Sequence, residues 1–135
     1  DCFAENGYTK EELKIINETR KILNLPKLKI TATAVRVPVL NCHAESINAE
    51  FFKPFDEQKV KTVLSAARGV VLFDQPEKGI YPTAADADGK EQVFIGRVRQ
   101  DFSAKSAINM WVVADNLLKG AAQNAVSIAE LLIKG

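Results

Sequence analysis

The chain has 135 residues, a length typical of one domain that buries roughly two thirds of its unfolded surface around a single core. Lysine and arginine (18) nearly balance aspartate and glutamate (17), so the net charge of +1 gives no electrostatic support for binding nucleic acid or an anionic membrane. No apolar run approaches the roughly 18 residues of a membrane-spanning helix, and no signal-peptide pattern is present. We therefore expect a cytoplasmic protein.

The first predicted element is a helix over residues 10–23. Thr9 followed three residues later by Glu12 forms a capping box, and Pro26 ends the element. One broad side is apolar, and the other side carries charges that recur at intervals of three and four, which is typical of a solvated face. These charged residues are Glu11, Lys14, Glu18 and Lys21.

Two strands are predicted next, over residues 28–40 and 43–53. In the first, β-branched residues alternate, so that Ile30, Ala32 and Ala34 share a face with Arg36. Pro38 indicates a strand end, a bulge or an edge. A guanidinium that is covered needs an anionic partner, and a carboxylate of the protein or a carboxylate or phosphate of a ligand would serve equally well.

A helix capped by Asp56 should follow, with Val60, Val63 and Leu64 directed inward and Gly69 as its stop. The apolar segment 70–74 is predicted to be a short strand. Proline, glycine and aspartate make residues 75–90 a long loop, and loops of this length are often functional.

Residues 92–103 and 106–115 are predicted to form two further strands, the second apolar on both faces and therefore central. The surface that carries Ile108, Met110 and Val112 fits either an interface or a domain core. A last helix should begin near Asp115 or Asn116, with its apolar side chains at helical spacing. These side chains are Leu117, Ala121, Ala125, Ile128 and Leu132. This order of elements predicts an α+β domain with a mixed, mostly antiparallel sheet and helices packed on one face.

Two residue types of this chain, histidine and cysteine, could take part in catalysis or metal binding. His43 is the single histidine, and a lone histidine is usually a satisfied structural residue, although it can act as an acid or base. Cys42 does not form a nucleophile–base pair with it, because adjacent residues of an extended segment point to opposite faces. Cys2 and Cys42 are expected to be reduced, and neither has a spacing that suggests a metal site.

Four segments, taken together, resemble the C-terminal half of bacterial aspartate-semialdehyde dehydrogenases. They are GYTKEELKIINETRKI, VRVPVLNCHAES, VFIGRVRQDFS and MWVVADNLLKGAAQNAVSIAELL, in the order and at the spacing of that family. The resemblance implies reduction of aspartyl phosphate to aspartate semialdehyde with NADPH, a step toward lysine, threonine, methionine and diaminopimelate. It also implies a homodimer or homotetramer and a sheet like that of the C-terminal domain of glyceraldehyde-3-phosphate dehydrogenase.

The same resemblance assigns roles to single residues. Arg36 of the V-R-V-P motif would bind the substrate carboxylate, and His43 would be the acid/base partner of a nucleophilic cysteine. Glu11 would contact the substrate ammonium group, and Lys14 would help to hold the phosphate. Asn116 takes the position of an amide that lies near the nicotinamide.

The expected organisation is a substrate-binding and dimerisation domain over residues 1–135, with the N-terminal Rossmann domain outside them. The family's Ser-Asn-Cys-Ser motif does not occur in these residues, so the isolated chain is expected to be inactive. Two alternatives stay open. One is a non-catalytic, dehydrogenase-like dimerisation module, and the other is a related N-acetylglutamyl-phosphate reductase, whose substrate lacks a free ammonium group.

Overall fold

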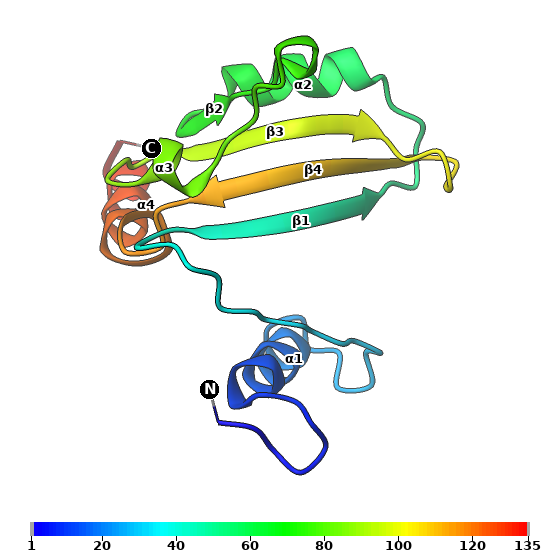
Figure 1. The fold of residues 1–135 in the computed structure, drawn as a ribbon, viewed down its shortest axis with the longest axis vertical. Helices are drawn as coiled ribbons and strands as arrows, with labels where there is room; N and C mark the ends of the chain where they lie inside the picture. The colour runs from blue at the N-terminus through cyan, green and yellow to red at the C-terminus, as the bar shows by residue number, and fades with distance from the viewer. Residues whose placement is uncertain (1, 135) are drawn as a thin grey trace. The chain divides into compact units, whose positions relative to one another are not determined.

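The computed structural model describes residues 2–134. Contacts within the chain divide it into two compact units, Asp1–Pro38 and Val39–Gly135, which are described separately below (Figure 1). None of the helices in the described residues is long and apolar enough to span a membrane. Cys2 and Cys42 form no disulfide within the described part of the chain.

The first unit is built on helix α1, Lys10–Ile22. The predicted capping box is present: the Thr9 hydroxyl accepts a hydrogen bond from the Glu12 N–H, and the Glu12 carboxylate accepts one from the Thr9 N–H. Ile16 is buried, whereas Ile22 at the end of the helix is largely exposed. The apolar side of α1 is therefore covered in its first turns and open in its last turn.

Residues 28–38 form no strand, so the first predicted strand is wrong. The predicted alternation is nevertheless visible, because Ile30, Ala32 and Ala34 are half-buried while their neighbours are exposed. Arg36, the fourth member of that face, is exposed. β-Branched alternation describes a pleated surface, but a strand also needs a neighbour to pair with, and no described segment pairs with this one.

The second unit contains a four-stranded sheet in the order β1-β4-β3-β2. The strands are β1 (His43–Glu50), β2 (Val70–Leu72), β3 (Val93–Gln100) and β4 (Ala107–Ala114). β4 pairs antiparallel with both β1 and β3, and β2 pairs parallel with β3. The α+β class, the mixed and mostly antiparallel sheet and the central position of β4 are confirmed.

Helix α2 (Glu57–Ala66) covers one face of this sheet (Figure 1). Val60 and Leu64 pack with the fully buried Ile108 and with Met110 and Val112. This surface of β4 is therefore a core of the unit. Val63 was expected to point inward as well, but it is 61% exposed, and it lines an apolar hollow together with Val60 and Leu64.

The other face is partly covered by the chain between β2 and β3. This segment, expected to be a plain loop, contains the short helices η1 (Pro76–Lys78) and α3 (Ala84–Ala87). Ala87 packs with Phe94 and Val113 on this face. Along β1, by contrast, the residues that point to this face are exposed, namely Ala44, Ser46 and Asn48.

The C-terminal helix begins later than predicted. Asn116 lies in a turn, a π-helical turn follows over Leu118–Ala122 (η2), and the regular helix α4 spans Gln123–Lys134. Ala121 has φ −136° and ψ −119°, so the backbone is kinked between the two helical segments. Apolar side chains of the predicted helical stripe are exposed, among them Ile128 (52%) and Leu132 (80%). Periodicity identified the apolar stripe of this helix, but the second unit does not cover it.

Candidate functional site

The first unit brings together the predicted substrate-binding residues. A guanidinium nitrogen of Arg36 lies 3.6 Å from Oε2 of Glu11, and both side chains are more than half exposed. Lys14 is one turn further along α1 and pairs with Glu18 at 3.9 Å. Exposed ion pairs of this kind contribute little to stability, so an ionic ligand can exchange with them at small cost.

Glu12 holds the segment that carries Arg36. Its Oε2 accepts from the Thr9 N–H at 2.7 Å, and its Oε1 accepts from the Ala34 N–H at 2.8 Å. These two backbone hydrogen bonds lower the pKa of Glu12, with a smaller contribution from the Thr9 hydroxyl. The sequence identified Glu12 only as a helix cap. Its second role could not be predicted, because the bond to Ala34 spans 22 residues.

The Tyr8 and Thr31 hydroxyls, 2.7 Å apart, add a second tie between the start of α1 and the same segment. The backbone around Arg36 is thus fastened to α1 at two points, although it belongs to no strand. This arrangement places a planar, permanently charged guanidinium beside a carboxylate on the surface of the unit.

His43 and Asn116 lie at one end of the sheet in the second unit. His43 opens β1 and is the register partner of Ala114, the last residue of β4. Asn116 follows two residues later and is half-buried, whereas His43 is exposed. Within the described part of the chain neither side chain makes a hydrogen bond, so both can still donate and accept.

Asn116 does not head a helix as expected. It lies in the turn before the π-helical segment, because the first helical turns after β4 are irregular. An argument from a helix N-terminus therefore does not apply to it. Its side-chain amide alone provides the polar group.

Cys42 directly precedes the exposed His43 but is itself buried, in a cluster with Ala87, Phe94 and Val113. Its thiol lies 3.4 Å from the carbonyl oxygen of Ala84, and its φ of +77° is in the left-handed region. Burial raises the pKa of the Cys42 thiol, and the negative charges of Asp115 and Asp88 raise it further. A buried thiol with a raised pKa is a poor nucleophile, which supports the prediction that Cys42 is not the catalytic cysteine.

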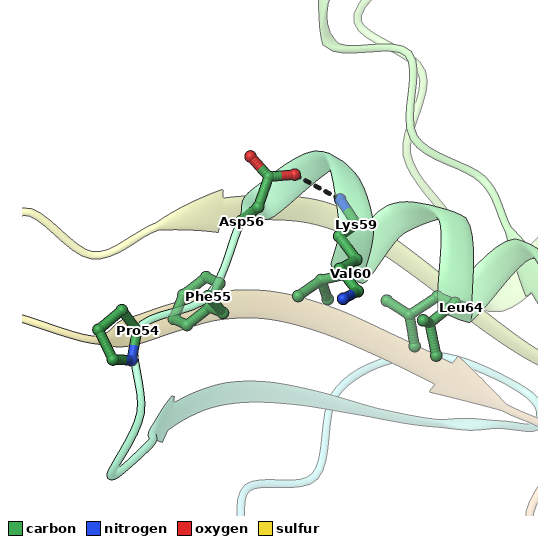
Figure 2. A pocket seen from close by; sticks show the side chains of 7 residues that line it. Pro54, Phe55, Asp56, Lys59, Val60 and Leu64 are labelled. Atoms are coloured by element: carbon green, nitrogen blue, oxygen red, sulfur yellow. Dashed lines mark hydrogen bonds between the residues drawn. The ribbon is translucent and has the colours of Figure 1, made fainter.

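A separate apolar hollow of about 330 Å³ lies at the start of α2 (Figure 2). It is lined by Phe55, Val60 and neighbouring residues of the helix, and Asp56 caps the helix by accepting from the Lys59 N–H at 2.7 Å. None of the predicted site residues lines it. Apart from Asp56 and Lys59 the described residues that line the hollow are apolar, and one oxygen of the Asp56 carboxylate is engaged by the helix end.

The second unit is an α+β domain that presents a lone histidine and an amide at one end of its sheet, and the first unit presents a carboxylate, a lysine and an arginine. These residues are the ones that the resemblance described above implies for one class of protein, the substrate-binding and dimerisation half of a semialdehyde dehydrogenase.

Comparisons with known proteins agree with this class. Residues 1–119 match the family described as "Semialdehyde dehydrogenase, dimerisation domain". The chain is 48% identical over 134 residues to aspartate-semialdehyde dehydrogenase of Aquifex aeolicus, covering 99% of the chain and 39% of the relative. The enzyme of Bacillus subtilis is 48% identical over 135 residues, with the same coverage. The chain belongs to the semialdehyde dehydrogenase dimerisation-domain family.

Solved structures of related proteins also support the fold. The structure of aspartate semialdehyde dehydrogenase II from Vibrio cholerae in complex with ASA matches with a TM-score of 0.80 at 50% identity, over 99% of this chain and 39% of that one. A probable aspartate-semialdehyde dehydrogenase from Pseudomonas aeruginosa matches with a TM-score of 0.79 at 32% identity, over 99% of this chain and 40% of that one. The chain thus spans about two fifths of the length of these relatives.

Proposed function

We propose that this chain is the substrate-binding and dimerisation part of an enzyme that reduces L-aspartyl 4-phosphate to L-aspartate 4-semialdehyde with NADPH. The observation that carries the proposal is the Arg36–Glu11 pair, because a zwitterionic amino acid needs one cationic and one anionic contact close together. The names of the relatives, at 48% identity, support the same substrate.

Each residue has a role that follows from its chemistry. Arg36 binds the α-carboxylate through two parallel N–H groups, and Glu11 accepts hydrogen bonds from the ammonium group. Lys14, one helical turn from Glu11, contributes a positive charge toward the phosphate. The Arg36–Glu11 contact holds the two side chains close together until the substrate replaces it.

His43 moves the protons of the reaction. It takes the proton of the nucleophilic thiol, which we place in an N-terminal cofactor domain, and returns a proton to the developing thiohemiacetal oxygen. NADPH, when bound, supplies the hydride. Within this chain Asn116 fits the cofactor through its amide, which has no partner among the described residues and can bond to a carboxamide.

The description of the family supports the same assignment. The family is described as a dimerisation domain, and the β1 side of the sheet exposes Ser46 and Asn48 on the face opposite α2. We propose that this open face pairs with a second copy to form a homodimer, which could assemble further to a homotetramer. The cytoplasm, where NADPH and phosphorylated amino acids are available, is the proposed location.

Kinetics of the complete enzyme test the proposal. His43→Ala should lower kcat by about 10²–10⁴-fold, the usual contribution of a general acid or base. Arg36→Lys should raise the KM for aspartate semialdehyde, because an ammonium group cannot make the two-pronged contact. Arg68→Lys is the matched control: it changes an exposed arginine that pairs with Glu130, and it should leave both constants unchanged.

The outcomes separate the alternatives. Unchanged turnover in His43→Ala would favour the non-catalytic dimerisation module. Activity with N-acetylglutamyl phosphate and none with aspartyl phosphate would favour the related reductase, in which Glu11 has no ammonium group to bind.

A further inference from the structure

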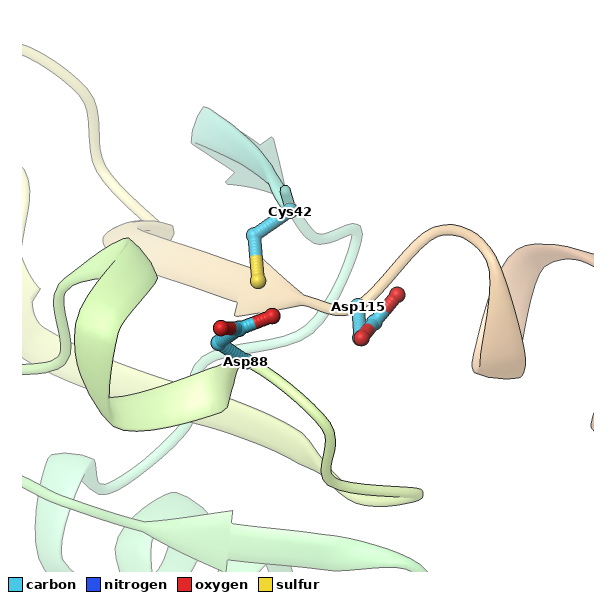
Figure 3. A group of neighbouring side chains, drawn as sticks. All are labelled: Cys42, Asp88 and Asp115. Atoms are coloured by element: carbon cyan, nitrogen blue, oxygen red, sulfur yellow. The ribbon is translucent and has the colours of Figure 1, made fainter. Parts of the chain in front are cut away.

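Three side chains from three separate segments lie close together near the C-terminal end of β4. Figure 3 shows Cys42, Asp88 and Asp115 pointing toward one another, and their ligand-type atoms all lie within 4.8 Å. Cys42 precedes His43, Asp88 follows α3, and Asp115 precedes Asn116. Two members of the cluster are therefore chain neighbours of His43 and Asn116, the residues of this unit to which the proposed function gives chemical roles.

Asp115 is the most constrained member of this cluster. It is 4% exposed, its Oδ2 accepts from the Gly89 N–H at 3.0 Å, and its Oδ1 accepts from the Leu117 N–H at 2.9 Å. Its backbone carbonyl oxygen also accepts from the N–H groups of Leu118 (3.2 Å) and Lys119 (2.8 Å). Both oxygens of the carboxylate are used to hold backbone, and three of the four bonds go to residues that immediately follow Asn116.

Asp88 is in the same cluster and is also acidic, but its carboxylate accepts no hydrogen bond from a backbone N–H of the described residues. It is exposed, and its Oδ1 accepts from the side-chain amide of Asn41 at 2.8 Å. Both aspartates therefore raise the pKa of the Cys42 thiol, but only the Asp115 carboxylate accepts hydrogen bonds from described backbone N–H groups. A comparison of the two residues thus separates the effect of negative charge from the effect of holding the backbone.

We infer that Asp115 is a positioning residue: its carboxylate fixes the turn that carries the Asn116 amide and ties this turn to Gly89. The inference rests on the proposed function of Asn116. The backbone of the turn makes only the two bonds to the Asp115 carbonyl oxygen among the described residues, and a kinked π-helical segment follows it. The buried carboxylate adds the bond to the Leu117 N–H and the tie to Gly89, so the amide is held before the cofactor arrives.

The test compares isosteric variants in the complete enzyme. In Asp115→Asn one oxygen becomes an NH₂ group that faces a backbone N–H, so one of the two bonds is lost and two donors oppose each other. We expect kcat/KM for NADP, measured with aspartate semialdehyde and phosphate, to fall by at least about tenfold. Asp88→Asn removes the same charge from the cluster and should change this constant by less than about twofold.

A double-mutant cycle with Asn116→Ala separates positioning from general stabilisation. If Asp115 acts through the Asn116 amide, Asp115→Asn should cause little further loss in the Asn116→Ala enzyme. Hydrogen exchange over residues 86–92 and 115–120 should rise in Asp115→Asn and stay at the wild-type level in Asp88→Asn, while the rest of the chain keeps its protection.

Equal effects of the two aspartate variants, or additive losses in the cycle, would overturn the inference and leave the proposed function intact. No effect of Asn116→Ala on NADP kinetics would instead remove the cofactor role of Asn116, and with it this inference. No dehydrogenase activity in the wild-type enzyme would contradict the proposed function as a whole.

Discussion

At the scale of single residues, Glu12 joins two levels of structure. As the third residue of α1 it closes a capping box with Thr9, and its second oxygen holds the Ala34 N–H. The same carboxylate thus starts the helix and fastens the segment that presents Arg36. Only the ionised form can accept both bonds fully, because a protonated oxygen becomes a donor.

This requirement predicts a pH dependence of stability. The backbone bonds from Thr9 and Ala34 lower the pKa of Glu12 below its ordinary value of 4.5. A group with a lowered pKa stabilises the folded state above its unfolded pKa, and this contribution disappears as the pH falls through the folded pKa. Glu12→Gln should therefore melt at a lower temperature than wild type at pH 7, and the two melting temperatures should converge as the pH falls through the lowered pKa of Glu12.

Circular dichroism melts between pH 3 and pH 7 would measure this difference. Glu18→Gln is a matched control, because Glu18 is an exposed glutamate of the same helix that pairs only loosely with Lys14. A constant gap between wild type and Glu12→Gln across the whole pH range would contradict the prediction.

At the scale of elements, α2 is fastened to an irregular part of β3. The β3–β4 register shifts between Gly96 and Arg99, which leaves N–H groups of β3 outside the ladder. The Asp74 carboxylate accepts a hydrogen bond from the backbone N–H of Arg97 at 2.7 Å, and the Glu57 carboxylate accepts one from the backbone N–H of Gln100 at 3.0 Å. Lys61 of α2 lies 3.1 Å from Glu57 and 3.3 Å from Asp74, so its charge balances both.

Gly96, at the edge of this irregularity, allows the segment before α3 to lie directly on β3. A β-carbon at this position would lie 2.5 Å from the Phe73 carbonyl oxygen and 2.5 Å from Cδ of Pro82. Neither contact can be relieved by rotating a flexible side chain. The close approach explains why a strand interior carries a glycine here.

Gly96→Ala should accordingly destabilise the chain by about 1–3 kcal/mol, the usual cost of overpacking. Urea denaturation measures the free energy of unfolding directly. Gly120→Ala is the control, because its β-carbon would meet nothing closer than 3.8 Å, the Asn116 Cβ. Equal stabilities of the two variants would show that β3 and the residue 73–82 segment are not packed as described.

At the scale of the whole molecule, the five assigned residues are divided between two units. Glu11, Lys14 and Arg36 belong to Asp1–Pro38, and His43 and Asn116 belong to Val39–Gly135. Within the described residues the two cysteines are an exposed Cys2 and a buried Cys42, and the Cys42 pKa is raised. Neither is set beside a base in a way that would activate a thiolate.

The isolated 135-residue chain should therefore not catalyse the proposed reaction. With aspartate semialdehyde, NADP and phosphate, NADPH absorbance at 340 nm should not rise above the rate without protein. Adding the N-terminal cofactor domain of a relative on the same chain should restore turnover. Turnover by the isolated chain would contradict the placement of the nucleophile outside these residues.

The sequence by itself determined what depends on neighbours along the chain. The capping box located the start of α1, alternation and apolar runs located the four strands of the sheet, and four linked motifs identified the family. It also predicted that Cys42 and His43 differ in their surroundings, and Cys42 is buried whereas His43 is exposed. The reason is not the period of an extended segment, because Cys42 has a φ of +77°.

Only the tertiary structure decided which pattern finds a partner. Residues 28–38 alternate like a strand but pair with nothing described, and Val63 follows a helical stripe but faces solvent. The bonds from Glu12 to Ala34 and from Asp115 to Gly89 join residues 22 and 26 positions apart. Local periodicity fixes the direction of a side chain relative to its own element, whereas burial and hydrogen bonding depend on what the rest of the chain places beside it.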